Sequence, residues 1–126
     1  MILDTDVLIW FFRGNEKAKT AIDKALPFSI SSVTFMELLQ GVKNKAEQMA
    51  IKKQLRTWNV NVIHLNEAIS IRSIQFVSDF SLSHSMAAMD ALIAGTVVEY
   101  DGKLLTGNSK HFEYVPGIEL YKFLPA

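Results

Sequence analysis

Acidic residues stand at three widely separated places in the chain where apolar residues surround them. Asp4 and Asp6 close a short apolar segment at the N-terminus, Glu37 lies in an apolar stretch, and Asp90 has apolar neighbours on both sides. Aspartate and glutamate are rarely buried without a partner. Carboxylates a few ångströms apart raise one another's pKa and stay ionised only beside a cation. If these segments converge in the fold, their oxygens favour a hard ion, Mg²⁺ or Mn²⁺.

A divalent ion held by carboxylates indicates a particular chemistry. Such an ion activates water, polarises a phosphodiester and stabilises the departing oxygen, so metal-assisted phosphodiester hydrolysis is the expected reaction. Zinc is a poor fit because the chain has no Cys and only three scattered His, which are His64, His84 and His111. The lack of Cys also excludes disulfides and Cys nucleophiles, and it is typical of a reducing compartment.

Each acid also has a purely structural interpretation. Either of the two N-terminal aspartates can cap a following helix. Thr34 and Glu37 have the spacing of a capping box at a helix start. Asp90 can form an ion pair with a partner such as Arg72. Spacing alone does not decide between these roles, but acids on distant segments that each follow a strand or lie in an apolar helix favour a shared site.

The composition predicts one globular domain over residues 1–126. The chain is 49% hydrophobic and 21% charged, which is far from the composition of a disordered protein. Its formal net charge is zero, so binding to a nucleic acid would need a local basic rim rather than an overall positive charge. No secretory leader and no run of about 18 apolar residues is apparent, and we therefore expect a cytoplasmic protein without a membrane segment.

Strand and helix patterns alternate along the chain and predict an α/β fold. An apolar strand begins at Ile2 and should end at the first acids. Further strands are expected over 28–31, 60–65, 103–106 and 118–123, and helices over 17–26, from 32 or 34 to 39, 45–58, 67–80 and 86–100, with 81–85 as a connector. This alternation predicts βαβ units and a mainly parallel sheet covered on both faces. The helix over 86–100, which holds Asp90, should be the most buried.

Four segments that contain these acids follow one another in a fixed order. They are Leu3–Ile9 (LDTDVLI), Ser31–Gly41 (SSVTFMELLQG), Met89–Ala94 (MDALIA) and Leu105–Phe112 (LTGNSKHF). In order and spacing they resemble the signature segments of PIN-domain nucleases of the VapC type. The resemblance extends over nearly the whole chain, and four segments together are far more specific than any one of them.

The resemblance implies both a fold and a function. It implies a three-layer α/β/α PIN domain and a Mg²⁺-dependent endoribonuclease, with Mn²⁺ as an alternative ion. It also implies the toxin half of a toxin–antitoxin pair, an RNA substrate, a homodimer and a VapB-like antitoxin that blocks the site. By position, Asp4 and Asp90 would be the principal metal ligands, and Glu37 would bind metal or position water.

The last of the four segments departs from the family pattern. Asn108 stands where many relatives have a fourth acid, and Lys110 and His111 stand where others have an acid before Phe112. Asp6 could compensate as an auxiliary ligand together with Asn108, although relatives commonly have Asn or Ser at the position of Asp6.

Contacts with the substrate are less specific in the sequence. We expect Thr106 and Asn108 to lie near the RNA, and Arg13 and Lys110 are candidate phosphate contacts, although scattered basic residues are more often plain surface charge. The same reservation holds for Lys17, Lys43 and Lys45. The aromatic run Trp10–Phe12 can take an antitoxin helix in an apolar groove or pack in the core.

Three other functions compete with a toxin nuclease. The first is a haloacid-dehalogenase-like phosphatase, because Asp4-Thr-Asp-Val7 fits that family's opening motif and would make Asp4 a nucleophile. That family needs paired acids after a later strand, which this chain lacks, and it explains neither Glu37 nor Asp90. The others are a PIN-type RNA-processing nuclease outside a toxin pair and a catalytically weak binding module.

Overall fold

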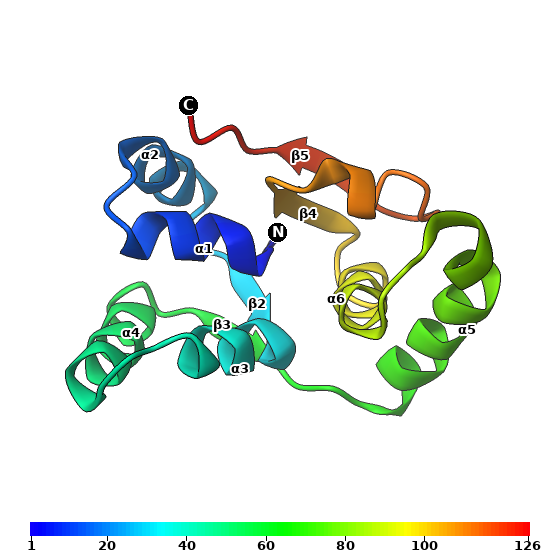
Figure 1. Cartoon of the computed structure of the whole chain (residues 1–126), viewed down its shortest axis with the longest axis horizontal. Coiled ribbons are helices and arrows are strands. Elements are labelled where there is room, and N and C mark those ends of the chain that lie inside the picture. The colour runs from blue at the N-terminus through cyan, green and yellow to red at the C-terminus, as the bar shows by residue number, and fades with distance from the viewer.

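Five parallel strands form the centre of the molecule (Figure 1). The structure is a computed structural model that describes residues 1–126. The strands are β1 (Ile2–Leu3), β2 (Ser29–Ser31), β3 (Asn61–Ile63), β4 (Lys103–Thr106) and β5 (Glu119–Lys122). They pair in the order β3-β2-β1-β4-β5, and every pairing is parallel. The predicted parallel sheet is therefore confirmed, and β1 is its central strand.

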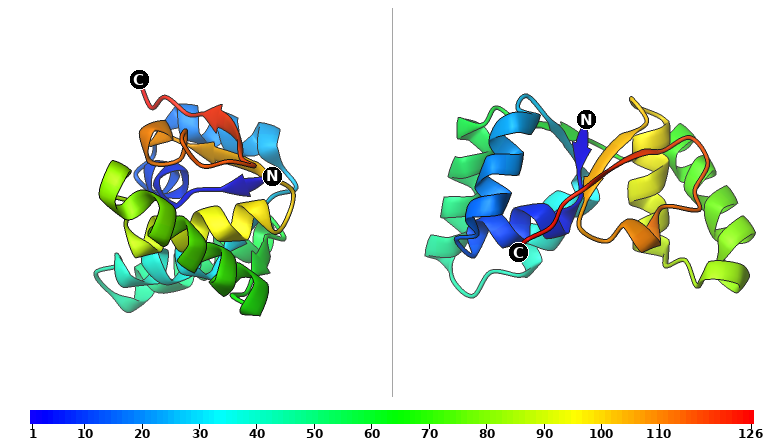
Figure 2. Two further views of the ribbon diagram at one scale, coloured as in Figure 1. Left: turned by 90° about the vertical axis from the view of Figure 1, so that its right-hand side faces the viewer. Right: turned by 90° about the horizontal axis from the view of Figure 1, so that it is seen from above.

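Helices cover both faces of the sheet (Figure 2). They are α1 (Thr5–Phe12), α2 (Glu16–Ala25), α3 (Ser32–Gln40), α4 (Lys45–Thr57), α5 (Glu67–His84) and α6 (Ala88–Val98), with a short 3₁₀ turn η1 (Ser109–His111) after β4. Seen from above, α1, α2 and α4 lie on one side of the strands and α5 and α6 on the other. This arrangement is the expected three-layer α/β/α fold. No helix combines the length and apolar content that crossing a membrane would require.

The two hydrophobic cores follow from the alternation of side chains along the strands. Leu3 and Leu105 enter one core with residues of α1, α2 and α4. Their strand neighbours Ile2 and Leu104 enter the second core with residues of α5 and α6. Strands buried on both faces are typical of parallel sheets with helices on either side. The helix α6 is the most buried one, as predicted, since six of its eleven residues are buried.

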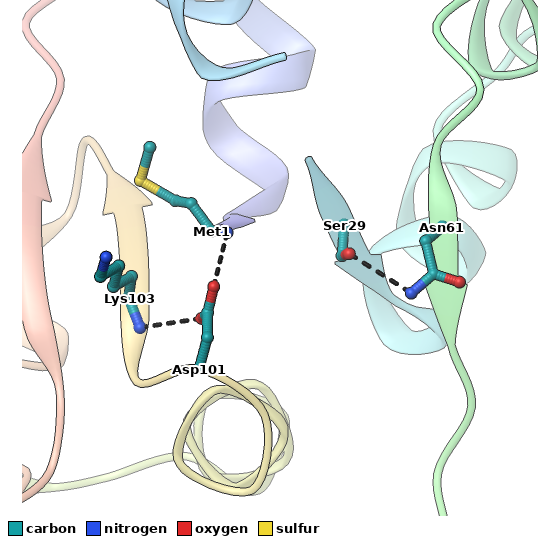
Figure 3. A network of polar contacts seen from close by, with 5 residues as sticks. All are labelled: Met1, Ser29, Asn61, Asp101 and Lys103. Carbon is teal, nitrogen blue, oxygen red and sulfur yellow. Dashed lines mark hydrogen bonds and ion pairs between the residues drawn. The ribbon is translucent and has the colours of Figure 1, made fainter. Parts of the chain in front are cut away.

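The N-terminal edge of the sheet is tied by polar contacts (Figure 3). The amino group of Met1 contacts the Asp101 carboxylate at 2.6 Å, and the other oxygen of Asp101 accepts the backbone N–H of Lys103 at 3.1 Å. On the neighbouring strands the side-chain amide of Asn61 donates to the Ser29 hydroxyl at 3.3 Å. These contacts hold β1, β4, β2 and β3 in place at the end of the sheet opposite to the acids.

Side chains cap most of the helices. Five of the six helices begin after a residue whose side chain accepts a backbone N–H; these residues are Asp4, Asn15, Ser31, Asn44 and Asn66. Such caps satisfy amides that the first helical turn leaves unpaired. The exception is α6, because the methyl group of Ala87 cannot accept a hydrogen bond. The first turn of α6 therefore presents uncapped N–H groups on the side where Asp90 lies.

The structure differs from the predicted elements in three places. The first strand ends at Leu3, directly before the first acid as predicted, but the helix α1 follows at once, which the sequence patterns did not predict. The expected connector 81–85 is wrong, because α5 continues through His84 and ends where Ser85 adopts a left-handed conformation. As a result α6 begins two residues later than predicted, at Ala88. No Gly or Pro interrupts residues 81–84, so nothing in that segment stops the helix.

Close packing of α5 against α6 depends on Gly95. A Cβ atom at this position would collide with the Ser73 hydroxyl and lie 3.1 Å from the Ile69 carbonyl oxygen. The Ser73 hydroxyl donates to that same carbonyl at 2.7 Å, so it cannot turn away without losing a buried hydrogen bond.

We expect Gly95→Ala to lower the free energy of unfolding by about 1–3 kcal/mol, because the added methyl group overpacks the interface between α5 and α6. Gly41→Ala is the matched control, since the nearest atom to its Cβ would be 3.6 Å away and its backbone is right-handed helical. That control should change the stability by less than about 1 kcal/mol. Urea unfolding followed by circular dichroism measures both, and equal midpoints would contradict the packing argument.

Candidate active site

Asp4 lies at the carboxyl end of the central strand and is almost fully buried, with 6% of its surface exposed. Its backbone N–H donates to the Leu105 carbonyl at 2.9 Å, which continues the pairing of β1 with β4. One carboxylate oxygen accepts the backbone N–H of Thr5 at 2.8 Å and thereby caps α1. The structural interpretation of Asp4 as a helix cap is therefore correct, and this cap holds the carboxylate at the edge of the sheet.

Thr106 fixes the other oxygen of Asp4. Its hydroxyl donates to Asp4 Oδ2 at 2.8 Å and accepts the backbone N–H of Asn108 at 2.9 Å. Thr106 is completely buried, so the structure places it behind Asp4 rather than on an accessible surface. Asn108 is exposed where the chain leaves β4, and its backbone N–H donates to the hydroxyl that holds Asp4. The end of β4 thus orients the carboxylate of the neighbouring strand.

Glu37 reaches the same region from α3. The Thr5 hydroxyl lies 2.7 Å from Glu37 Oε1 and 2.9 Å from the Thr34 hydroxyl. Because a carboxylate only accepts, the Thr5 proton goes to Glu37 and the Thr34 hydroxyl is left to donate to Thr5. The predicted capping box is wrong, since Ser31 caps α3 and Glu37 does not reach back to the helix start. Thr5 connects Glu37 to the backbone that carries Asp4.

Asp6 lies in the first turn of α1, one residue beyond Thr5. Its Oδ2 atom accepts the backbone N–H of Gly107 at 2.9 Å. Its Oδ1 atom is buried and has no hydrogen-bond partner. A Cβ atom at residue 107 would collide with Asp6 Oδ2, so any side chain there would displace the Asp6 carboxylate. An orphaned carboxylate oxygen beside Asp4 is an open ligand position for a cation.

Asp90 lies in the first turn of α6 and pairs with His111. The distance from His111 Nδ1 to Asp90 Oδ2 is 3.1 Å. Arg72, the structural partner considered from the sequence, instead contacts Glu99 at 3.0 Å, so that interpretation is wrong. The contact with His111 was not predicted, although the sequence places His111 just after the strand that leads to the site. Only the η1 turn brings its ring to Asp90.

Burial and neighbouring charges act together on Asp4. Burial and, to a lesser extent, the charges of Asp6 and Asp90 raise the pKa of Asp4, hydrogen bonds from Thr106 and Thr5 lower it, and the net result is a pKa of about 7. Burial also raises the pKa of Asp6, against the effect of the Gly107 hydrogen bond. Asp6 and Asp90 therefore lie close enough to Asp4 to oppose its ionisation, and a cation bound among these acids would relieve that repulsion.

A groove lies beside Glu37. It has a volume of about 470 Å³ and lies between α1, α3 and α4; its walls are Ile9, Phe12, Arg13, Glu37, Leu38, Gly41, Val42, Lys43, Glu47, Ala50 and Ile51. Arg13 and Lys43 place positive charge on the wall of this groove. Lys17, Lys45 and Lys110 are exposed and do not line it. Of the aromatic run, Phe11 and Phe12 pack near Trp58, so the core-packing interpretation is correct for both.

The donor set fits a hard divalent cation. No group of three or more His, Cys, Asp or Glu side chains is already gathered at ligand positions. Mutual repulsion keeps carboxylates apart without a cation, and Mg²⁺ commonly keeps several waters while one or two carboxylates bind it. The unpartnered Asp6 oxygen and the raised pKa of Asp4 both indicate a place where positive charge is missing.

Comparison with known proteins identifies the architecture. The family model described as "PIN domain" matches residues 1–118. A toxin-antitoxin complex from Klebsiella pneumoniae has a chain that is 29% identical, with a TM-score of 0.79 over 99% of this chain and 97% of that one. A chain of DNA-bound VapBC from Salmonella typhimurium is 22% identical and gives a TM-score of 0.82 over 98% of this chain and 97% of that one. A chain of DNA-bound VapBC2 from Rickettsia felis is 19% identical and also gives a TM-score of 0.82, over 98% of each chain. No curated protein sequence matches.

The raised pKa of Asp4 predicts an unusual pH dependence of stability in the absence of metal. The folded protein holds this proton up to about pH 7, whereas the unfolded chain releases it near 3.8. The folded state thus binds more protons between these values, and the free energy of unfolding should fall as the pH rises from about 4 to about 7. At about 1.4 kcal/mol per pKa unit the loss reaches at most about 4 kcal/mol.

Urea unfolding in EDTA at several pH values measures this slope. Asp4→Asn is the decisive variant, because asparagine also caps a helix but does not titrate. It should remove most of the slope, and the raised pKa of Asp6 should leave a smaller remainder of the same sign. A wild-type stability that rises between pH 5 and 7 would show that Asp4 is ionised in the folded protein.

Proposed function

The chain belongs to the PIN domain family, and on this basis we propose that it is a metal-dependent endoribonuclease acting as the toxin of a VapBC-type pair. The observation that carries the proposal is the convergence of Asp4, Asp6, Glu37 and Asp90 at one edge of the sheet. Two of these acids are linked through Thr5, and the charges of Asp6 and Asp90 both act on Asp4. The phosphatase alternative accounts for neither Glu37 nor Asp90 in this arrangement.

In this proposal Asp4 and Asp90 are the principal ligands of Mg²⁺ or Mn²⁺, with Asp6 and Asn108 as auxiliary ones. When bound there, the ion would supply an activated water and would neutralise charge on the phosphodiester. Thr106 keeps Asp4 in its orientation through the 2.8 Å hydrogen bond. Glu37, held by Thr5, completes the metal site or orients the attacking water.

The substrate in this proposal is RNA, bound through its phosphates. The net charge of zero excludes strong general attraction, so local cations must position the backbone. Arg13 and Lys43 on the groove wall and the exposed Lys110 are the candidates. Asn108 lies at the exposed end of β4 and can offer its amide to the substrate.

A VapB-like antitoxin is the proposed protein partner. The support is the similarity to chains of toxin-antitoxin and VapBC complexes. The groove between α1, α3 and α4 has a mainly apolar wall that suits one face of an amphipathic helix. Because Glu37 lines the same groove, a peptide seated there would also cover an acid of the site. A homodimer is also proposed, and the exposed Ile71 and Ile74 on α5 support it.

Asp90→Asn should abolish cleavage of bulk cellular RNA by antitoxin-free protein, with a loss of at least about 100-fold, because it removes a charged ligand and keeps the side-chain shape. Asp79→Asn is the matched control, since Asp79 is an exposed carboxylate on α5 that contacts Gln75 rather than the site. Gel analysis in Mg²⁺, in Mn²⁺ and in EDTA gives the readout. If Asp90→Asn forms the same fragments as the wild type, Asp90 is not a residue of the active site. If folded wild-type protein leaves the RNA intact, the binding-only module is favoured.

Asn108→Asp tests the departure from the family pattern. An added carboxylate at this edge should leave the affinity for Mg²⁺ unchanged or raise it by up to about 10-fold, because more ligand charge strengthens the binding of hard cations. Calorimetric titration with Mg²⁺ measures the change. A clear loss of affinity would mean that the Asn108 amide itself is needed.

A further inference from the structure

His111 has the only side-chain nitrogen atom that contacts an acid of the site. It belongs to the η1 turn, and its Nδ1 atom lies 3.1 Å from Asp90 Oδ2. The His111 side chain is 56% exposed and that of Asp90 27% exposed, so both are open to solvent and to ions. An ion pair this exposed contributes only about 0–1 kcal/mol to stability, so stability alone gives little reason for the contact.

The spacing of the two atoms suits two neighbouring ligands of one ion. Ligands at about 2.1 Å from an octahedral ion lie about 3.0 Å apart when they are adjacent. The observed separation of 3.1 Å is therefore that of an octahedral edge as well as that of a hydrogen bond. An ion can replace the proton between these atoms with little movement of either side chain.

A third acid, Asp6, lies near enough to feel the charge of the imidazole. The charge of His111 lowers the pKa of Asp6, so His111 lies close to Asp6 as well as to Asp90. The Oδ1 atom of Asp6 is the one buried side-chain atom without a partner. An ion held by His111 and Asp90 would therefore have Asp6 as a charged neighbour, and waters can complete its shell.

We propose that His111 is a nitrogen ligand of the metal ion held by Asp90, and that it shifts the preference of the site from Mg²⁺ towards Mn²⁺. This inference rests on the metal site in the proposed function and adds the identity of the ion. Mg²⁺ binds almost only oxygen donors, whereas imidazole suits first-row transition ions. Asn108 adds to the effect, because its neutral amide supplies no charge for a hard ion.

The first experiment is calorimetric titration of the metal-free protein with Mn²⁺ and, separately, with Mg²⁺. His111→Ala should weaken Mn²⁺ binding about 10-fold or more and change Mg²⁺ binding less than about twofold. His111→Asp should lower the ratio of Mn²⁺ to Mg²⁺ affinity about 10-fold, because it replaces nitrogen by oxygen. His111 is exposed, so these variants should fold.

His111→Gln separates ligation from hydrogen bonding. Its amide can still donate to Asp90 but is a weak metal ligand. Loss of Mn²⁺ affinity in this variant supports the proposal. Wild-type Mn²⁺ affinity in His111→Gln would overturn it and make His111 a hydrogen-bonding residue that only positions Asp90.

Pulsed electron paramagnetic resonance of the Mn²⁺-loaded protein gives a direct signature. Coupling of the Mn²⁺ electron spin to an imidazole nitrogen should appear in the wild type, change with ¹⁵N-labelled histidine and vanish in His111→Ala. His64→Gln is the matched control and should keep the coupling, because His64 has no contact with the acids. Mn²⁺ bound through Asp90 but without nitrogen coupling would overturn only the role of His111. Failure of both ions to bind the wild type, or unchanged binding by Asp90→Asn, would overturn the metal site and this inference together.

Discussion

Repulsion between carboxylates at one edge of a buried sheet is the constraint on which the rest of the structure depends. Asp4 is 6% exposed, yet Asp6 and Asp90 both act on it electrostatically. A protein that buries such a group must hold each oxygen by a donor. Here the donors are the Thr5 backbone N–H and the Thr106 hydroxyl. The immediate start of α1 after β1 supplies the Thr5 N–H, and the end of β4 supplies the Thr106 hydroxyl.

The sheet order explains why residues so far apart in the chain meet. β1 is central, with β2 and β4 on either side, and all strands run in one direction. Their carboxyl ends therefore lead Asp4, α3 with Glu37 and the turn after β4 to a single edge. Asp90 arrives on α6, which packs beneath the same strands on one face. The ties at the opposite edge, including the contact of Met1 with Asp101, keep this register.

The features that could be predicted from the sequence are those that depend on local periodicity or on a motif. Alternating strands and helices predicted the parallel sheet, and the order of the strands and helices led us to expect that acids on distant segments would face the same edge of it. The start of α1 could not be predicted, because an apolar run such as Val7–Phe11 suits strand and helix alike. The contact of Asp90 with His111 could not be predicted either, since it depends on the course of the η1 turn and on α5 ending at His84. The buried, unpartnered oxygen of Asp6 can be recognised only from packing.

The close approach of Gly107 to Asp6 also constrains how relatives of this chain can diverge. The backbone N–H of Gly107 donates to Asp6 Oδ2, and the space of a Cβ is already occupied by that oxygen. A lineage that acquires any side chain at residue 107 must therefore shorten or reorient residue 6, and aspartate in its present position at residue 6 favours glycine at residue 107. Covariation of these two positions, 101 residues apart, would be the evolutionary record of a single interatomic contact.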